Sequence, residues 1–289
     1  MRRRGVASVQ TESTLVDKRL SSSIIVFLGL VLAQGSRAYA SWEVGARGGF
    51  DSNVSLSVND GKEDAYLTGY VSFFREPSGE SRLGWHLAST LEGSAYLELN
   101  DLNGASASVA PGLTFVPFPG WSLEAGPFLQ GKIVKDSEQS ALTFGGKVNL
   151  WQQLGGRFYT GEHYIYQDSR ADTETFSFTE HTVGVLLGVN WTRRFYTEAS
   201  YDFSYGDSFV TLSTSTTVVE GRGRHRRASQ VFGGEVVREK VARHALGASL
   251  GIDWTEALFS RAGYTYTLMD GDLGSADVHS TYAEMGYRF

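Results

Sequence analysis

The chain contains 289 residues, including 34 Gly, 5 Pro and no Cys, and it carries a formal net charge of −6. This length accommodates one large all-β unit or two small domains. The absence of Cys excludes disulfide scaffolds, Cys-ligated metals and Cys nucleophiles, and the acidic balance argues against nucleic acid as a partner.

Residues 1–40 have the composition of a signal peptide. An apolar run, 24–33, is followed by Ala38-Tyr39-Ala40, which fits the small-x-small pattern before cleavage at Ser41. The run is shorter than the roughly 20 residues that a transmembrane helix needs. Ahead of it lie the basic residues Arg2, Arg3, Arg4, Lys18 and Arg19. We expect residues 1–40 to be cleaved, with translation starting at Met1 or downstream of it, which leaves a mature net charge of about −10.

After residue 41, apolar and polar side chains alternate over short segments, a period that predicts β-strands. Twelve strands are expected, at 42–51, 64–74, 81–97, 105–116, 121–135, 142–151, 158–166, 179–191, 195–205, 242–254, 258–268 and 277–289. Both faces of 158–166 are mixed, so its orientation stays open. The connection 206–241 reads as a hairpin beyond a membrane, and fourteen strands result if it crosses the bilayer instead.

Short turns alternate with longer polar loops along these strands, an asymmetry typical of bacterial outer-membrane barrels. No run of about 18 apolar residues follows residue 41, and a chain that spans a membrane without helices must form a closed barrel. We therefore predict that residues 41–289 form an all-β, antiparallel, up-and-down transmembrane barrel. A secreted two-sheet sandwich with a dry core is the alternative.

Aromatic residues are placed as two belts at membrane interfaces would require. Five Trp residues lie at strand ends on one side, although alternation puts one of them, Trp151, on the inner face. The five are Trp42, Trp121, Trp151, Trp191 and Trp254. The opposite belt is expected to be rich in Tyr, with Tyr201, Tyr205, Tyr264, Tyr266, Tyr164 and Tyr166.

Alternation sends charges of both signs to the inner face, which argues against a filter of a single sign. These charges line a water-filled pore, pair into a plug, or simply keep the wall solvated. The predicted pore-lining residues are Glu43, Arg47, Arg82, His86, Glu92, Glu124, Lys132, Lys147, Glu198, Asp202, Arg261, Glu284 and Arg288, with Glu180, Arg243 and Asp253 on the same face.

The first and last strands predict their own register. Antiparallel pairing of Glu43 with Arg288 also places Arg47 opposite Glu284, and opposite charges that face each other favour a register. We expect the barrel to close at this seam.

Two Pro residues, Pro111 and Pro127, fall inside neighbouring strands and nearly opposite each other. Proline cannot donate to a β-ladder, and a closed barrel has no free edge for it. The sequence leaves open a local bulge or a weak seam through which an apolar ligand passes sideways.

The basic cluster at the tip of the long connection contains Arg222, Arg224, Arg226 and Arg227. Such runs are usually solvated, and the functional hypothesis is contact with anionic groups at the cell surface.

No phosphate loop, zinc-protease motif or nucleophile elbow is present, and we predict no catalytic, cofactor or metal site. Barrel lipid hydrolases are expected to place a Ser two residues after a His, and the nearest approach here is His279 with Thr281.

The predicted leader, the alternating strands and the final Tyr287-Arg288-Phe289 resemble Gram-negative outer-membrane β-barrels, and Gly49-Phe50-Asp51-Ser52-Asn53-Val54 resembles a segment of β-barrel porin families. This resemblance implies contact with outer-membrane lipids and lipopolysaccharide, and assembly by the barrel-insertion machinery, with Tyr287 and Phe289 as the assembly signal. We expect a channel for small hydrophilic solutes or the outlet of an export system, including one for polysaccharide. A structural or surface-binding barrel with an occluded lumen is the alternative, and a lipid-modifying enzyme is the least favoured.

Overall fold

A computed structural model describes residues 40–77, 81–212 and 226–289. Its strands are β1 (Ala40–Asp51), β2 (Asp64–Arg75), β3 (Leu83–Tyr96), β4 (Gly104–Phe115), β5 (Trp121–Val134), β6 (Ala141–Leu154), β7 (Phe158–Ala171), β8 (Phe178–Asn190), β9 (Phe195–Leu212), β10 (Arg226–Ser229), β11 (Gly234–Asp253), β12 (Leu258–Gly271) and β13 (Gly274–Arg288). Three 3-10 turns, η1 (Asn100–Leu102), η2 (Ser137–Gln139) and η3 (Glu174–Phe176), lie between strands. None of the helical segments in these residues is long and apolar enough to cross a membrane.

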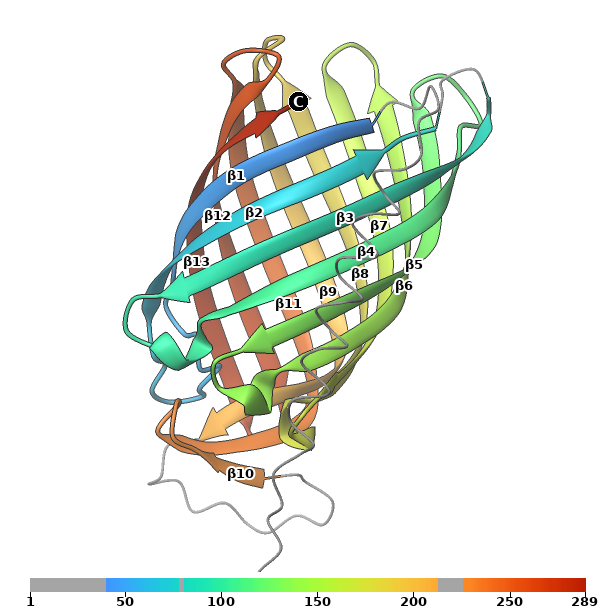
Figure 1. The fold of residues 1–289 in the computed structure, drawn as a ribbon. Helices are drawn as coiled ribbons and strands as arrows, with labels where there is room; N and C mark the ends of the chain where they lie inside the picture. Colours follow the sequence, from blue (N-terminus) through green and yellow to red (C-terminus); the bar gives the residue numbers. More distant parts are fainter. Residues whose placement is uncertain (1–39, 78–80, 213–225) are drawn as a thin grey trace, which may run out of the picture. The chain divides into compact units, whose positions relative to one another are not determined.

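The strands form a closed antiparallel barrel, as predicted (Figure 1). Each strand pairs with its sequence neighbour, β9 pairs with β11, and β13 pairs with β1 to close the sheet. The short strand β10 is added to β11 outside the barrel wall, so twelve strands form the wall. We call the end that holds Ala40 and Phe289 the terminal end, and the opposite end the loop end.

The predicted closing seam is confirmed. Glu43 lies opposite Arg288 and Arg47 opposite Glu284 in the pairing of β1 with β13. Both pairs form ion pairs, with Arg47 Nη2 2.9 Å from Glu284 Oε2 and Arg288 Nε 3.1 Å from Glu43 Oε2.

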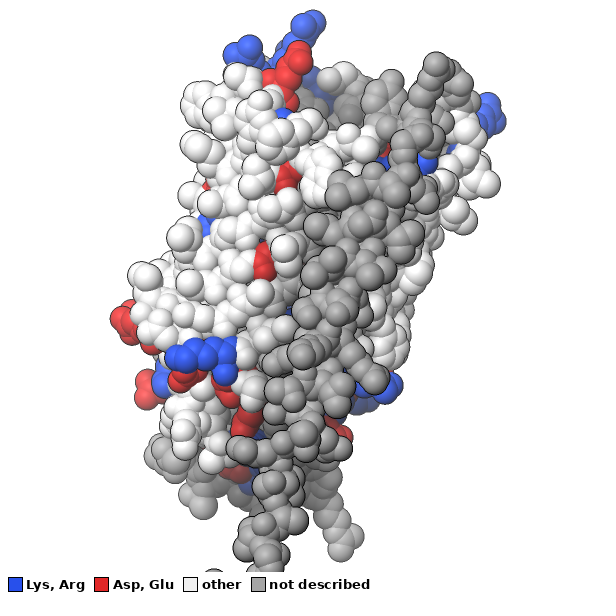
Figure 2. All heavy atoms as spheres, viewed as in Figure 1, with Lys and Arg blue, Asp and Glu red and all other residues white. Residues whose placement is uncertain are grey.

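The outer face of the wall is apolar, because alternation along each strand sends every second side chain away from the lumen. Exposed hydrophobic residues on this face include Leu67, Leu91, Leu113, Val183 and Leu246. On the face shown in Figure 2, charged side chains gather toward the two ends, and the wall between them is mostly uncharged. This band is what a lipid-facing surface requires.

The Trp belt lies at the terminal end, where exposed Trp191 and Trp254 each donate from Nε1 to a hydroxyl, Thr197 Oγ1 at 2.9 Å and Ser260 Oγ at 3.0 Å. Trp151 points inward, as alternation requires, and stacks on Tyr159 with ring centroids 4.7 Å apart.

A Tyr–His belt lies on the outer face nearer the loop end. The hydroxyls of Tyr164, Tyr201 and Tyr264 lie 2.7–2.8 Å from Nδ1 of His181, His244 and His279, respectively. Each His lies about ten residues along its strand from the aromatic residue at the terminal end, Trp191, Trp254 or Phe289. At about 3.3 Å per residue and a tilt of about 40°, this separates the two belts by about 25 Å, the height of an outer-membrane apolar band.

The ladder between β4 and β5 is interrupted at the two Pro residues. Val109 pairs with Leu129 and Leu113 with Ala125, which leaves three unpaired positions centred on Pro111 and Pro127. The register is the same on both sides of the gap, whereas a bulge would add a residue to one strand. The bulge interpretation is therefore wrong, and a seam of missing rungs is observed instead.

The inner face is built from aromatic rings that lie over glycines of the neighbouring strand. A Cβ built on Gly45 would lie 2.5 Å from the hydroxyl of Tyr70, and one built on Gly188 would meet the ring of Tyr159. The directly paired positions of this kind are Tyr66 and Gly49, Tyr70 and Gly45, Tyr159 and Gly188, Tyr196 and Gly251, Phe259 and Gly286, and Tyr282 and Gly263. Because these glycines have no Cβ, the rings lie flat against the wall instead of projecting into the lumen.

Candidate functional site

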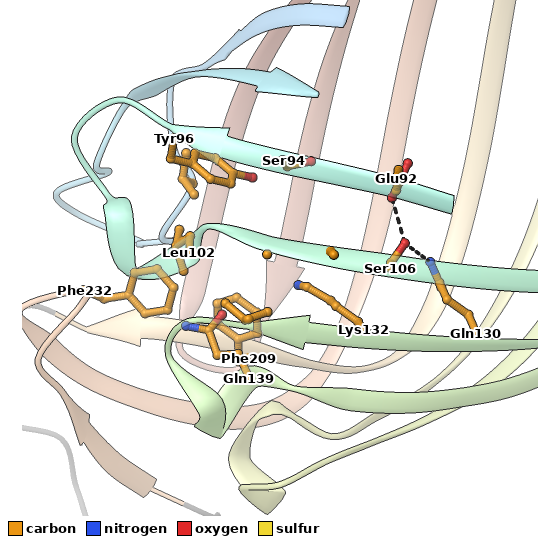
Figure 3. A pocket seen from close by; sticks show the side chains of 14 residues that line it. Glu92, Ser94, Tyr96, Leu102, Ser106, Gln130, Lys132, Gln139, Phe209 and Phe232 are labelled. Carbon is orange, nitrogen blue, oxygen red and sulfur yellow. Dashed lines mark hydrogen bonds between the residues drawn. The ribbon is translucent and has the colours of Figure 1, made fainter. Parts of the chain in front are cut away.

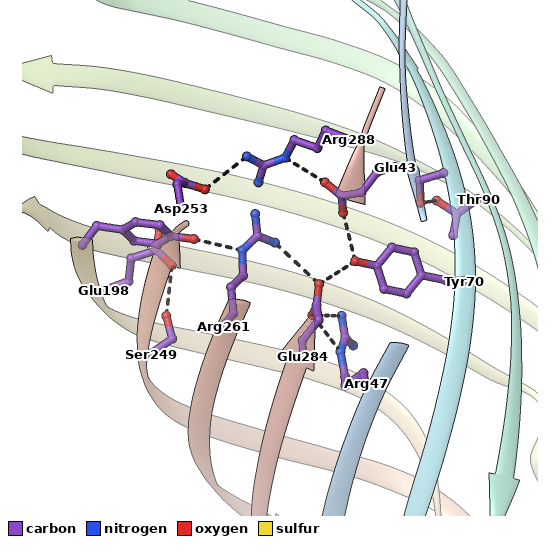
Figure 4. Close-up of polar contacts among 12 residues, drawn as sticks. Glu43, Arg47, Tyr70, Thr90, Glu198, Ser249, Asp253, Arg261, Glu284 and Arg288 are labelled. Carbon is purple, nitrogen blue, oxygen red and sulfur yellow. Dashed lines mark hydrogen bonds and ion pairs between the residues drawn. The ribbon is translucent and has the colours of Figure 1, made fainter. Parts of the chain in front are cut away.

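The candidate site is the lumen, which contains a polar network near the terminal end (Figure 4). Glu284, on β13, is its centre and has only 3% of its side chain exposed. It accepts hydrogen bonds from Arg47 of β1 at 2.9 and 3.1 Å and from the hydroxyl of Tyr70 of β2 at 2.6 Å. Tyr70 also reaches Glu43 Oε1 at 3.0 Å, so the network ties β13, β1 and β2 together across the closing seam.

A second branch of the network continues along the wall to β9. Arg261 lies 4.0 Å from Glu284 and donates from Nε to the hydroxyl of Tyr196 at 2.9 Å. Arg288 bridges Glu43 and Asp253, with its Nη1 3.3 Å from Asp253 Oδ1. Each of these contacts joins strands that are neighbours or next neighbours, so the network lines the wall rather than crossing the lumen.

The ring of Phe259, 1% exposed, lies beneath the two cations of this branch. The guanidinium carbon of Arg288 is 4.2 Å from the ring centroid, and that of Arg261 is 4.8 Å away. Cation–π contacts of this kind hold guanidinium groups in place.

A third group of inner-wall contacts lies along β7 to β11. Tyr159 donates to Glu198 Oε1 at 2.9 Å, and His163 Nε2 lies 3.1 Å from Asp202 Oδ1 above Gly184. Farther toward the loop end, Arg243 Nη1 lies 3.3 Å from Glu180.

The registers place the predicted pore-lining residues on the inner face, with one exception. Arg82 precedes β3 and lies in the turn at the terminal end. His86 is buried, and its Nδ1 is 2.8 Å from the hydroxyl of Thr114, so it is part of the wall. The network joins Glu43, Arg47, Arg261, Glu284 and Arg288, whereas Glu92, Glu124, Lys132 and Lys147 lie on β3, β5 and β6.

The inner-face tyrosines and His163 were not among the predicted pore-lining residues. The tyrosines Tyr66, Tyr70, Tyr159, Tyr196 and Tyr282 each alternate with outward apolar residues and lie opposite a Gly, and this combination could have identified them. Both faces of the segment 158–166 are mixed in sequence, so alternation does not place His163 on either face.

The connection between β1 and β2, residues 52–63, folds into the loop end of the barrel; we call it the inner loop. Asn53, 5% exposed, holds it: Nδ2 donates to the carbonyls of Ser57 at 2.9 Å and Asp277 at 3.2 Å, and Oδ1 accepts from Ser57 N at 2.9 Å. Leu56 and Val58 pack on the inner wall against Val210, Val241, Met269 and Ala276. The segment 49–54, which resembles sequences of porin families, thus covers the end of β1 and the start of this loop.

Beyond Gly206 and Val241, strands β9 and β11 pair with each other but no longer with β8 or β12. These extensions, 207–212 and 234–240, and the segment 226–233 form what we call the lid, at the loop end in Figure 1. Phe209 and Phe232 stack at 5.7 Å, with the edge of Phe176 of η3 5.4 Å from Phe209. Leu102 of η1 packs on this cluster from the β3–β4 connection, on the opposite side of the twelve-strand ring, so the lid reaches across the mouth.

Polar contacts fasten the lid to several connections. Arg227 of β10 forms an ion pair with Glu138 of η2, and Lys62 of the inner loop donates to the carbonyl of Val231 at 2.9 Å. Arg238 Nη2 lies 2.8 Å from Asp207 Oδ2. Of the predicted surface-anion residues, Arg222 and Arg224 lie outside the described residues. Arg227 is paired as stated, and Arg226 lies 3.9 Å from Glu235.

A cavity of about 370 Å³ lies between the lid and the wall of β3–β5 (Figure 3). Its polar wall contains a chain in which Ser106 donates to Glu92 at 3.0 Å and Gln130 reaches Ser106 at 3.4 Å. Lys132 projects into the same space, and Phe209 and Phe232 close it from the lid side. The space is within the size range of small-molecule sites.

Acidic side chains outnumber basic ones on the inner wall. The inward carboxylates are Glu43, Asp51, Asp64, Glu92, Glu124, Glu180, Glu198, Asp202, Asp253 and Glu284, against the cations Arg47, Lys132, Lys147, Arg243, Arg261 and Arg288. Such a wall attracts cations weakly without forming a filter of one sign. In residues 40–77, 81–212 and 226–289, no group of three or more His, Asp or Glu is arranged to hold a metal ion.

The fold is shared with solved outer-membrane channels. The COG4313 outer membrane channel from Pseudomonas putida F1 aligns with a TM-score of 0.62 at 7% identity, covering 89% of this chain and 97% of that one. The NanC porin aligns with a TM-score of 0.51 at 13% identity, covering 84% and 98% of the two chains. No protein-family model matches the sequence, and no curated protein sequence is significantly similar to it. At these identities the comparisons show the fold alone.

Proposed function

We propose that this protein is a porin-like channel of the bacterial outer membrane that passes small hydrophilic solutes past a closable lid. The observation that carries the proposal is the wall-lining arrangement of the charged network. Its contacts run between strands that are close together in the barrel, which supports a lumen that the charged side chains line rather than cross.

The proposed setting accounts for the rest of the molecule. Residues 1–40 would act as the export signal, and Tyr287 and Phe289 as the signal read by the assembly machinery. The outward ring of Tyr287 lies 5.0 Å from that of Phe289, and both rings are exposed, which supports such recognition. The terminal end would face the periplasm, and the Tyr–His belt would lie among lipopolysaccharide headgroups.

In the proposed channel the lid is the gate. Its ion pair between Arg227 and Glu138 joins β10 to η2, and both side chains are partly exposed, at 49% and 33%. Such a pair contributes at most about 1 kcal/mol to holding the lid closed, in addition to the packing of Phe209 and Phe232.

Single-channel recording of the refolded protein in planar bilayers tests the proposal. We expect discrete conductance steps with a weak preference for K⁺ over Cl⁻, because acidic groups outnumber basic ones on the wall. Glu138→Gln combined with Arg227→Gln should raise the open fraction by up to about fivefold, the effect of losing about 1 kcal/mol. Asp168→Asn with Arg170→Gln removes an ion pair on the outer face and is the matched control.

The occluded barrel is the second candidate, favoured by the same lid. Absence of conductance in the wild type and in the lid variant would support it against the channel. An outlet role in export of polysaccharide predicts a conducting barrel that co-purifies with an export complex.

A further inference from the structure

The strand whose orientation the sequence left open carries a carboxylate on the lipid-facing side. Glu162 of β7 lies opposite Leu150 of β6 and Val185 of β8, and both neighbours belong to the apolar outer face. Ionisable residues that face lipid are costly and seldom kept without a role.

The level of Glu162 in the wall follows from comparison with the two equivalent strands. Trp191 and Trp254 donate to Thr197 and Ser260, the third residues of β9 and β12. Thr160 is the third residue of β7 and Glu162 the fifth, where β9 and β12 have Ala199 and Ala262. Strand β7 therefore has a carboxylate just inside the Trp belt, where the other two have a methyl group.

The hydrogen-bond donors to the Glu162 carboxylate lie on the side of the terminal end. Gln152 donates to Oε2 at 2.9 Å and Thr160 donates to Oε1 at 3.0 Å, and both donors are neutral. Within the described part of the chain, no Lys, Arg or His forms an ion pair with this carboxylate. The described residues thus hydrogen-bond this charge but place no cation against it.

A shallow apolar groove of about 730 Å³ runs along the outer wall from Glu162 toward the loop end. Its lining is Leu123, Val148, Leu150, Glu162, His163, Tyr164, Val183, Gly184, Val185, Tyr201 and Phe203. The hydroxyls of Tyr164 and Tyr201 are hydrogen-bonded to His181 and His244. The groove therefore presents an apolar surface to a ligand, with the Glu162 carboxylate at one end.

We propose that this groove binds one aminophospholipid from the leaflet at the terminal end, with its ammonium group on Glu162 and an acyl chain along the groove. Charge complementarity selects this occupant. A phosphatidylglycerol headgroup is anionic, lipid A presents phosphates in the opposite leaflet, and a second copy of this face brings no cation to Glu162. The inference rests on insertion of the barrel into a bilayer, and not on passage of a solute.

Native mass spectrometry of the protein taken from nanodiscs with equal phosphatidylethanolamine and phosphatidylglycerol tests this site. The wild type should retain one phosphatidylethanolamine in preference to phosphatidylglycerol by about fivefold or more, because hydrogen bonds to charged groups are the stronger ones. Glu162→Gln should abolish the preference. Glu256→Gln, which changes an exposed carboxylate in a turn at the terminal end, should keep it.

Equal retention of the two lipids by the wild type overturns the proposal and needs no variant. An unchanged preference in Glu162→Gln overturns it as well, and lipid-free dimers that separate when Glu162 is changed would assign the face to a second copy. Insertion into nanodiscs without lipid preference would leave the channel proposal intact, since conductance is measured separately.

Discussion

Glycines on the inner face of this barrel make space for rings rather than for turns. A Cβ at Gly188 would overlap the ring of Tyr159, whereas one at Gly69, on the outer face of β2, meets nothing within 4 Å. Alternation in the sequence places the two glycines on opposite faces, and only the strand pairing shows that a ring lies over Gly188.

Gly188→Ala is expected to lower the free energy of unfolding by about 1–3 kcal/mol, because the Tyr159 ring must leave its place and its bond to Glu198. Gly69→Ala should change it by less than about 0.5 kcal/mol. Urea unfolding in detergent, followed by gel shift, measures both. Equal effects of the two substitutions would contradict the role given to the paired glycine.

Glu284 has the most partners of any carboxylate in the network shown in Figure 4. Glu284→Ala leaves Arg47 and Arg261 without their shared partner, and we expect a loss of about 3–5 kcal/mol. Asp101→Ala breaks the exposed pair with Lys135 and should cost less than about 1 kcal/mol. The same urea titration compares them, and a loss at Glu284 as small as that at Asp101 would show that the network does not hold the seam.

At the scale of the strand, the gap between β4 and β5 is a local weakness in an otherwise continuous ladder. Peptides covering 110–112 and 126–128 should exchange amide hydrogens faster than those at the loop-end half of the same strands, where pairing is continuous. Pro111→Val with Pro127→Val restores two donors and should slow the exchange. Peptide-level hydrogen exchange by mass spectrometry in detergent decides. Equal protection from amide exchange along the whole of β4 and β5 in the wild type would contradict a local weakness at the two Pro residues.

A structural repeat joins two hairpins of the wall, β8–β9 and β11–β12, although their sequences look different. His181, Trp191 and Tyr201 recur at the same spacing as His244, Trp254 and Tyr264, and each Trp makes the same hydroxyl contact. The repeat could have been read from the sequence by aligning the Trp-Thr pairs. The repeat gives equivalent positions along the strands, and at the position of Ala199 and Ala262 strand β7 has Glu162 instead.

The closing seam determines whether the whole molecule is a barrel at all, and its register can be tested directly. Glu43→Cys with Arg288→Cys should form a disulfide, since residues directly opposite lie about 4.5–5.5 Å apart. Arg47→Cys with Arg288→Cys, displaced by four residues along β1, should not. The chain has no other Cys to confuse the result. Gel mobility without and with reductant reports the cross-link, and cross-linking of the displaced pair would refute the register.

Alternation of side chains was enough to predict an all-β closed barrel, its twelve wall strands, the inward side of most charges and the register of the seam. Each of these follows from the period of two, which is local, or from charges that must face each other. Some strand ends differ from the prediction: β7 continues to Ala171 and β9 to Leu212, beyond the predicted 166 and 205. At the loop end the alternation no longer has an apolar outer face to enforce it.

The sequence alone determined the face on which most side chains lie, because a strand in a barrel wall has only two, and strand β7 was the exception. Only the tertiary structure decided which residues meet across strands and loops: Glu284 with Tyr70, Asn53 with the carbonyl of Asp277, and Phe209 with Phe232. These contacts depend on pairings far apart in the chain and on loops that fold back over the mouth. No local period encodes them, and they determine whether the lumen is open.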